Sequence, residues 1–375
     1  MTPSAPAPQR PTDGTPVVLG IDIGGTKTAA ALIPTSPKTE PHLPTPPPAS
    51  AEAEIHLPTS PPASGEAEIH LPGRVPTPAE GGATAVLAAA LGLAADRLAQ
   101  ARAAGMKVIA CGVGSAGTID DKGVVTHATD ALPGWRGTDL ATAFTDRLGL
   151  PVTVLNDVHA WALGEARHGA ARGSRLALVL TIGTGIGGAL VRDGELLRGR
   201  NGMTGSLGHT PAVLPPGADA DRLCPCGATG HLEAYASGPA ILSTYRTRGG
   251  TATNLESLLI PAPPGHAART FSGSTDPPGS PETTGQRDAT DPLAREVIRE
   301  AALILGRSIA SAATLLDPDV IVLGGGVTGL GDLLTVPLVE TVRRYAPRGL
   351  GSVPIRLSTL GPHGAVLGAA SAAMP

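Results

Sequence analysis

The stretch that decides the fold is Pro16 to Ile33, PVVLGIDIGGTKTAAALI. One apolar run ends in glycines and a second follows at once, which predicts two strands joined by a tight turn. Glycine allows the successive backbone N–H groups of such a turn to point at an anion. Asp22, at the end of the first strand, could hold Mg²⁺ through water; the alternative is an aspartate that caps its own turn.

Two later segments repeat this pattern: GTGIGG, Gly183 to Gly188, and LGGGV, Leu323 to Val327. Three glycine turns after apolar strands favour a polyphosphate ligand. GTGIGG fits the dinucleotide fingerprint, but the next residues alternate and turn at Asp-Gly, so we expect a hairpin where that fingerprint needs a helix. Lys27 follows Gly-Gly-Thr and lacks the Gly-Lys pair of a P-loop, so it is either a phosphate contact or a solvated hairpin lysine.

The rest of the chain alternates predicted strands with predicted helices, which indicates an α/β architecture whose sheets are covered by helices. The expected strands cover 106–114, 151–157, three segments of 175–197, and 318–326, and the expected helices cover 83–104, 158–169 and 292–316.

Composition narrows the classes of function. The chain has 375 residues, a net charge of −4 and only 2% aromatic residues, so we expect a core of Ala, Val, Leu and Ile. No basic block suggests nucleic-acid binding. No apolar stretch of the ~18 residues that cross a bilayer is apparent, and no signal peptide, so we expect a cytoplasmic protein without membrane contact.

Two proline-rich segments interrupt the pattern. HLPTPPPASAEAEI (42–55) is repeated as HLPTSPPASGEAEI (56–69), and a third copy starts at HLPG. Proline at nearly every third place prevents a helix or a central strand. We interpret this repeat, and the similar segment 261–292, as surface inserts without chemical consequence.

The segment VLNDVHAW holds the acid-base candidate. Asp157 stands where a strand ends and a helix begins, so it could be the helix N-cap. The functional alternative is that Asp157 accepts a proton from a sugar hydroxyl attacking a γ-phosphate, while Asn156 bonds a neighbouring hydroxyl.

The segment CPCGATGHLE, Cys224 to Glu233, raises the question of a metal site, a disulfide or chance. Cysteines one residue apart do not readily close a disulfide on each other. A tight turn at Pro225 and Gly227 could let both thiolates hold one zinc.

These motifs together resemble the ROK family of sugar kinases and sugar-responsive repressors. GIDIGGTKT, LND, LTIGTGIGGAL, GSLGH, CPCGATGHLEAYASG and DVIVLGGGV occur in the family's order and approximate spacing. The resemblance implies an α/β fold of two actin-like (ribonuclease H-like) domains, as in the hexokinase and actin superfamily, with an interdomain cleft. It also implies MgATP, transfer of a phosphoryl group to a hexose hydroxyl, usually at C6, and the prospect of a homo-oligomer.

On this resemblance we divide the chain into two domains and two inserts. The predicted parts are a disordered N-terminus 1–16, a first domain 17–126 with a Pro-rich insert 34–78 and a closing C-terminal helix 363–375, and a second domain 127–362 with a zinc loop 205–233 and a disordered insert 261–292.

The resemblance also implies roles for individual residues. Asp157 would be the general base. Nucleotide and Mg²⁺ would contact Asp22, Gly24, Gly25, Thr26, Lys27, Thr184, Gly185, Gly324, Gly325 and Gly326. The sugar would contact Asn156, Asp157, His209 and Glu233. A structural zinc would be held by His209, Cys224, Cys226 and His231, with a zinc-free remnant as the alternative.

Three positions depart from the family pattern. Ser206 replaces a sugar-contacting glutamate, Ala131 replaces an asparagine, and His231 replaces a third cysteine. Because two polar groups for the sugar are lost, a hexose and an N-acetylhexosamine are both compatible with this chain. The losses also motivate a second hypothesis, a sugar-binding regulatory protein without kinase activity. A repressor of this family needs a helix-turn-helix domain, for which the 16 residues ahead of the first strand are too few.

Overall fold

The computed structural model describes residues 14, 16–35, 68–129, 131–259 and 291–375. The first sheet has five strands in the order β3-β2-β1-β4-β7, in which β1, β2 and β3 are antiparallel neighbours while β1, β4 and β7 are parallel. Its strands are β1 (Pro16–Ile23), β2 (Lys27–Pro34), β3 (His70–Pro76), β4 (Lys107–Ser115) and β7 (Val152–Asn156).

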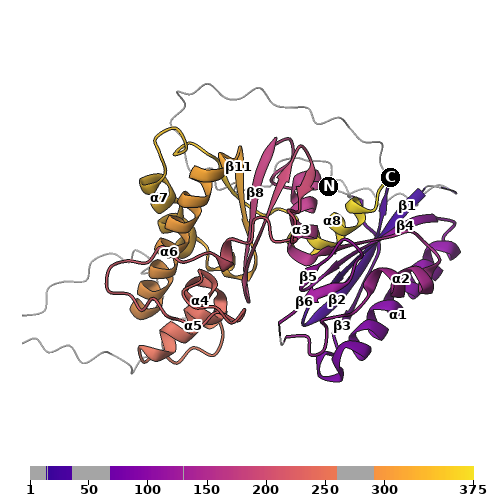
Figure 1. Cartoon of the computed structure of the whole chain (residues 1–375), viewed down its shortest axis with the longest axis horizontal. Coiled ribbons are helices and arrows are strands. Elements are labelled where there is room, and N and C mark those ends of the chain that lie inside the picture. The colour runs from indigo at the N-terminus through magenta and orange to yellow at the C-terminus, as the bar shows by residue number, and fades with distance from the viewer. Residues whose placement is uncertain (1–13, 15, 36–67, 130, 260–290) are drawn as a thin grey trace, which may run out of the picture.

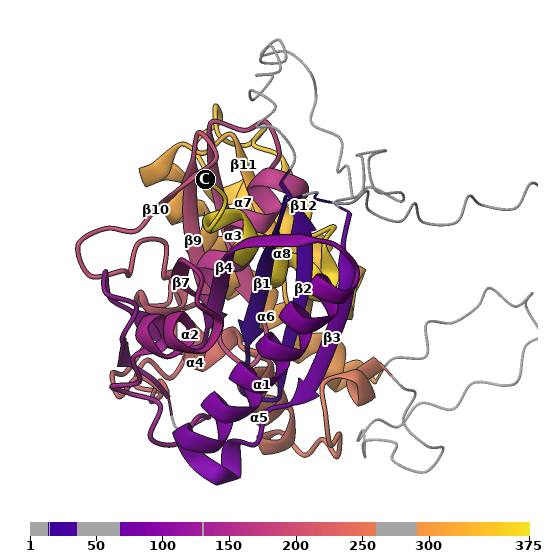
Figure 2. The same cartoon turned by 90° about the vertical axis from the view of Figure 1, so that its right-hand side faces the viewer.

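Strand β1 is apolar almost throughout because both faces of its sheet are covered. Val17, Leu19 and Ile21 belong to a core shared with helices α1 (Gly82–Ala103) and α2 (Leu140–Leu148). Val18 on the other face packs against α8 (Gly364–Ala372). Figure 2 shows α1 in front of β1, β2 and β3 and α8 behind them.

Helix α1 bears on the expectation that no stretch of the chain is long and apolar enough to cross a bilayer. Together with the turn before it, Ala79–Ala103 is long and apolar enough to cross a membrane by length and composition alone. The sequence pattern does not reveal this stretch as a candidate membrane span, because its many alanines and glycines are only mildly apolar. Val86, Ala90 and Leu98 lie on the side that packs on the sheet, so the apolar character of α1 is that of a sheet-covering helix.

The second sheet also has five strands, in the order β10-β9-β8-β11-β12. Strands β8 and β9 form the hairpin expected around GTGIGG, pairing Ile182 with Ile186, which excludes the dinucleotide-binding geometry. The strands are β8 (Leu176–Ile182), β9 (Ile186–Arg192), β10 (Glu195–Leu197), β11 (Val320–Gly324) and β12 (Ile355–Leu357). One face packs on α4 (Glu233–Ala236), α5 (Gly238–Thr247), α6 (Pro292–Leu316) and α7 (Asp332–Tyr345).

Helix α3 (Asp157–His168) covers the other face of the second sheet and packs against α8, so these two helices lie between the sheets (Figure 1). The contact is close because it is made of glycines. A Cβ atom added to Gly164 would lie 2.3 Å from the carbonyl oxygen of Gly364, and one added to Gly368 would lie 1.6 Å from that of Ala160. A side chain at either glycine would therefore push α3 and α8 apart.

The predicted division between the domains at 126/127 differs from the structure. Strand β7 pairs with β4 from Cys111↔Val152 to Ser115↔Asn156, and Phe144 of α2 is buried in the first core. The first sheet is therefore completed only at Asn156. Pairing between strands far apart in the chain is not visible in local patterns, which is why the sequence placed the boundary too early.

The predicted insert 34–78 is also too long. Strand β3 pairs with β2 at the edge of the first sheet, so the third copy of the proline-rich repeat starts a strand. Pro72 and Pro76 are tolerated because an edge strand needs hydrogen bonds on one side only. The first two copies of the repeat and the predicted disordered segments 1–16 and 261–292 lie largely outside the described residues.

Shorter elements complete the described chain. They are β5 (Thr118–Ile119), β6 (Val125–His127), and the 3-10 turns η1 (Ala79–Gly81), η2 (Leu207–His209), η3 (Glu256–Leu259), η4 (Gly326–Leu330) and η5 (Gly361–His363).

Candidate functional site

Two predicted acidic residues lie at the carboxyl edge of the first sheet. Register pairs Asp22 of β1 with Gly114 of β4, and Gly114 with Leu155 of β7, so Asp22 and Asp157 are separated by one strand. Gly114 has no side chain to fill the space between them, and a Cβ added there would lie 3.8 Å from the Cα of Asp157. The carboxyl edge is where open α/β sheets bind ligands.

Asn156, and not Asp157, is the N-cap of α3. Its Oδ1 accepts the backbone N–H of His159 at 3.1 Å, while its Nδ2 donates to the carbonyl of Gly117 at 2.9 Å and to Oδ1 of Asp157 at 2.8 Å. Both polar atoms of Asn156 are therefore engaged within the protein. Its position orients the carboxylate of Asp157.

Asp157 keeps one oxygen available. Oδ1 accepts the backbone N–H of Val158 at 2.8 Å and the Asn156 amide, whereas Oδ2 has no hydrogen bond within the part of the chain that the structure describes. Burial raises the pKa of Asp157 to about 6, partly offset by these bonds. The carboxylate is thus a stronger base than an exposed aspartate and is still mostly ionised at neutral pH.

Asp22 is a second carboxylate with a raised pKa. Burial, and then the charge of Asp157, raise its pKa to about 7, while the ammonium of Lys27 acts in the opposite direction. A buried carboxylate whose proton affinity is raised further by a neighbouring carboxylate marks a place where a divalent cation is stabilising. The donor set is of the oxygen type that Mg²⁺ prefers.

The first glycine turn is held by the residue that follows β3. Thr77 donates its hydroxyl to the carbonyl of Gly24 at 2.8 Å and its backbone N–H to that of Thr26 at 3.1 Å. Gly24 itself donates to the carbonyl of Lys27 at 3.1 Å, so the turn is closed. The sequence did not indicate Thr77, because its role depends on the pairing of β3.

The second and third turns meet at a cavity of about 770 Å³. Gly183 and Thr184 line one side, Gly326 lines another, and the loops around α5 and η3 complete it. The start of α5 could have been predicted from the sequence, because Ser237 caps the helix and Gly-Pro follows it. Further lining residues that the sequence did not indicate are Leu242, Arg246, Thr247, Asn254, Leu255 and Glu256.

The other predicted glycines lie around this cavity without lining it. Gly324 ends β11, where an added Cβ would lie 2.4 Å from the Trp161 ring. Gly325 has φ of 90° and approaches β8, since a Cβ there would lie 2.4 Å from the carbonyl oxygen of Ile182. Gly185 lies against Glu233, since a Cβ added to Gly185 would lie 2.5 Å from Oε2 of Glu233. These three glycines permit close packing of the turns against the neighbouring elements.

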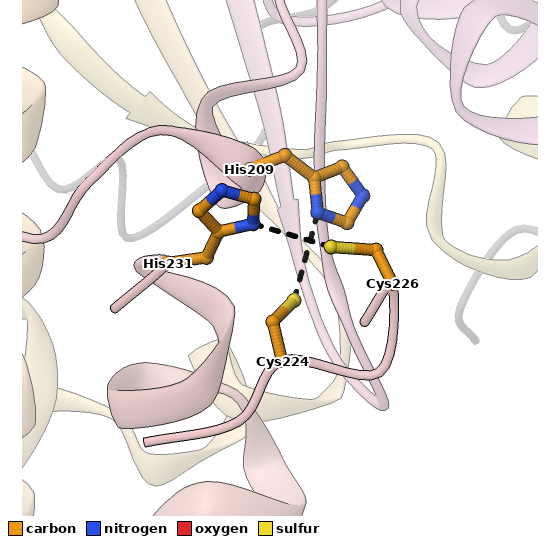
Figure 3. A group of neighbouring side chains, drawn as sticks. All are labelled: His209, Cys224, Cys226 and His231. Carbon is orange, nitrogen blue, oxygen red and sulfur yellow. Dashed lines mark hydrogen bonds between the residues drawn. The ribbon is translucent and has the colours of Figure 1, made fainter. Parts of the chain in front are cut away.

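The structure brings together the four predicted metal ligands, His209, Cys224, Cys226 and His231 (Figure 3). Their ligand atoms lie within 4.8 Å of one another. Nδ1 of His209 is 3.7 Å from Sγ of Cys224, and Nδ1 of His231 is 3.2 Å from Sγ of Cys226. A tetrahedral zinc with ordinary bond lengths needs nitrogen and sulfur about 3.5 Å apart. The four side chains therefore fit such an ion.

Glu233 links this group to the hairpin of the second turn. It begins α4, is 8% exposed, and accepts the backbone N–H of Ile186 through Oε2 at 2.7 Å. The thiol of Cys224 lies 3.8 Å from Oε1. The observed partners of Glu233 are thus protein groups, one at each carboxylate oxygen.

Comparison with known proteins places this chain among sugar kinases. A model of the ROK family matches residues 65–374. A glucokinase from Halalkalibacterium halodurans is 36% identical over 263 residues, 70% of this chain and 74% of that protein.

Two solved structures resemble the whole chain. The match to the ROK hexokinase from Thermus thermophilus covers 95% of this chain and 97% of that protein, at 31% identity and a TM-score of 0.68. The ROK family glucokinase from Streptomyces griseus, in complex with glucose and AMPPNP, covers 95% and 99% at 29% identity and a TM-score of 0.66. The fold class predicted from the sequence, that of the hexokinase and actin superfamily, is confirmed.

Proposed function

The chain belongs to the ROK family, and from that premise we propose that it is an ATP-dependent sugar kinase that phosphorylates a hexose or an N-acetylhexosamine at the C6 hydroxyl. The observation that carries this proposal is the unpartnered Oδ2 of Asp157 at the sheet edge that also holds Asp22 and the first glycine turn.

The nucleotide is assigned to the second sheet. The cavity of about 770 Å³ has the size of a site for a nucleoside, and Arg246 and Asn254 supply polar groups in its wall. Gly183 and Thr184 line it, and the next residue of the same turn, Gly185, lies against Glu233. The phosphates would lie between this turn and the turn of Gly24 and Gly25.

Asp22 would hold Mg²⁺ at the first turn. When bound, this ion neutralises charge on the phosphate oxygens. Occupancy by the cation also lowers the proton affinity that burial and Asp157 create at Asp22.

The chemical step assigns one proton to Asp157. The sugar oxygen forms a bond to the γ-phosphorus, the bond from that phosphorus to the bridging oxygen of ADP breaks, and Oδ2 of Asp157 takes the hydroxyl proton. Asn156 and the N–H of Val158 hold Oδ1, so the other oxygen faces a fixed direction. Positioning of this kind supplies much of the rate in phosphoryl transfer.

His209, Cys224, Cys226 and His231 would hold a structural zinc. A closed set of four protein ligands leaves no position for a reacting water, which is typical of structural sites. The ion would fix the segment that carries His209 beside Glu233, and Glu233 is bonded to the β8–β9 hairpin. Zinc binding would in this way stabilise the sugar side of the site.

The sugar is tested directly. Purified protein with MgATP is assayed for ADP release with glucose, mannose, N-acetylglucosamine and N-acetylmannosamine, and with 6-deoxyglucose as the matched control. We expect turnover of at least one sugar and none of 6-deoxyglucose. Turnover of 6-deoxyglucose would place the reaction at another hydroxyl.

The alternative function is a sugar-binding regulatory protein without kinase activity. It is motivated by Ser206 and Ala131, which carry fewer polar groups for a sugar than glutamate and asparagine. Saturable sugar binding by calorimetry with no ADP release from any of the four sugars would establish that alternative and reject the kinase.

A further inference from the structure

A second cavity, of about 390 Å³, lies on the first sheet and shares no lining residue with the nucleotide cavity. It is bounded by the edge strand β3, by its neighbour β2 and by the start of α8. Its polar side chains are Lys27, Arg74 and His363, and the rest of its lining is Ala29, Ala30, Ala31, Pro72, Gly73, Pro362 and Val366.

Strand register shows that both cations are on the cavity face. Arg74 pairs with Ala29, which packs on the α8 side of the sheet. The neighbouring Gly73 faces the opposite side, because a Cβ added to it would lie 3.0 Å from Nη1 of Arg97 on α1. Since side chains alternate along a strand, Arg74 faces α8.

The same alternation places Lys27. Its neighbour Thr28 is fully buried and lies 3.1 Å, hydroxyl to hydroxyl, from Thr77. Lys27 is therefore on the other side, with Ala29 and the start of α8. His363, in the turn just before α8, completes the group from a segment that is remote in sequence.

Among the described residues, no ion pair neutralises the cations of this cavity. No carboxylate lines it, and neither Lys27 nor Arg74 has an ion pair within the described ranges. The acidic group that acts on Lys27 is Asp22, at the adjacent glycine turn. Two cations over a floor of small apolar side chains attract an anion, and the fork of an arginine matches phosphate oxygens in particular.

We propose that this cavity binds a phosphate-bearing anion in addition to the phosphoryl donor, and that Lys27, which the family resemblance assigns to the nucleotide, serves this second anion instead. Its volume lies within the range of small-molecule sites and exceeds what one phosphate ion fills, which favours a phosphate ester or a short polyphosphate. Arg74 would bind two phosphate oxygens, with Lys27 and His363 on the remaining oxygens.

The test is calorimetric titration of the full chain, with and without saturating Mg-AMPPNP, at constant ionic strength. The probes are inorganic phosphate, tripolyphosphate and glucose 6-phosphate, and the probe that binds most tightly identifies the source of the phosphate. The variants are Arg74→Ala, Arg74→Glu and His363→Ala, with Arg102→Ala as the matched control because Arg102 is an exposed arginine at the end of α1.

We expect one anion per chain in the presence of the nucleotide analogue. Arg74→Ala should weaken binding about tenfold because one charge-assisted contact is lost, and Arg74→Glu should abolish binding. His363→Ala should weaken binding about threefold because one weaker contact is lost. Arg102→Ala should bind as the wild type does. The proposal is overturned if none of the three probes binds, if Arg74→Glu binds as tightly as the wild type, or if the analogue displaces the anion. The titration without nucleotide is independent of kinase activity, so failure of either proposal can be recognised separately.

Discussion

Replacing Asp157 by asparagine is the substitution that separates catalysis from folding. The asparagine has the same shape, and its Oδ1 can still accept the N–H of Val158 and the amide of Asn156. The basic oxygen, Oδ2, becomes an amide that cannot take a proton. Loss of a general base costs a factor of about 10² to 10⁴ in kcat, or roughly 2.7 to 5.4 kcal/mol in the barrier at 1.36 kcal/mol per decade.

The same substitution should not destabilise the protein. In the folded chain the pKa of Asp157 is raised from 3.8 to about 6, so the ionised carboxylate is less favourable there than in the unfolded chain. A shift of about two units corresponds to about 3 kcal/mol, and partial exposure reduces this, so we expect a gain of about 1 to 2 kcal/mol at pH 8.

Two measurements on one preparation decide this prediction. ADP release gives kcat and KM, and urea unfolding at pH 8 gives the free energy of unfolding. Asp121→Asn is the control, since Asp121 is an exposed aspartate in another turn. A variant that keeps more than a tenth of wild-type kcat refutes the assignment of the base. A variant that loses both activity and stability refutes the reasoning about burial, because its inactivity would then follow from misfolding.

Four further predictions follow from the site and the helix contacts. Since burial raises the pKa of Asp157 to about 6 and of Asp22 to about 7, kcat/KM should rise as pH increases from 5 to 7, and a flat pH profile would contradict this. In the nucleotide-free fold the carboxyl groups of Asp157 and Asp22 stabilise the protein most below pH 3.8, where both are protonated. This stabilisation is lost as pH rises through 6 and 7, so their contribution to the free energy of unfolding should be smaller at pH 8 than at pH 5. Gly112→Ala should cost about 3 kcal/mol in urea unfolding because its Cβ would lie 1.8 Å from the Ala369 carbonyl oxygen, whereas Gly92→Ala, with open space around it, should be neutral or stabilising; equal effects would argue against close packing of α8. Purified protein should hold one zinc by elemental analysis, and His231→Ala should lose it and melt at lower temperature, while absence of stoichiometric zinc would reject the metal site.

Features that depend on local sequence were predictable. Both hairpins with glycine turns follow from two apolar runs and a turn signal, and they occur as β1–β2 and β8–β9. The side chains proposed to bind metal are of the right type, and the structure brings them within 4.8 Å. In each case the residues that interact are either neighbours in the chain or chemically specific.

Features that depend on pairing between distant segments were not predictable. The place of β7 in the first sheet, and of β3 at its edge, follows from register with β4 and β2, which composition does not reveal. The role of Thr77 depends on that register. In the segment Asn156-Asp157 either residue can cap a helix, and only the observed hydrogen bonds assign the cap to Asn156.

Helix α8 has a consequence for how the protein is made. Gly20 on β1 and Gly112 on β4 approach the α8 backbone closely: a Cβ added to Gly20 would lie 2.3 Å from the carbonyl oxygen of Val366, and one added to Gly112 would lie 1.8 Å from that of Ala369. Among the described elements, α8 is the last to leave the ribosome. One face of the first sheet therefore stays uncovered until α8 has been synthesised, well after the strands that this helix covers.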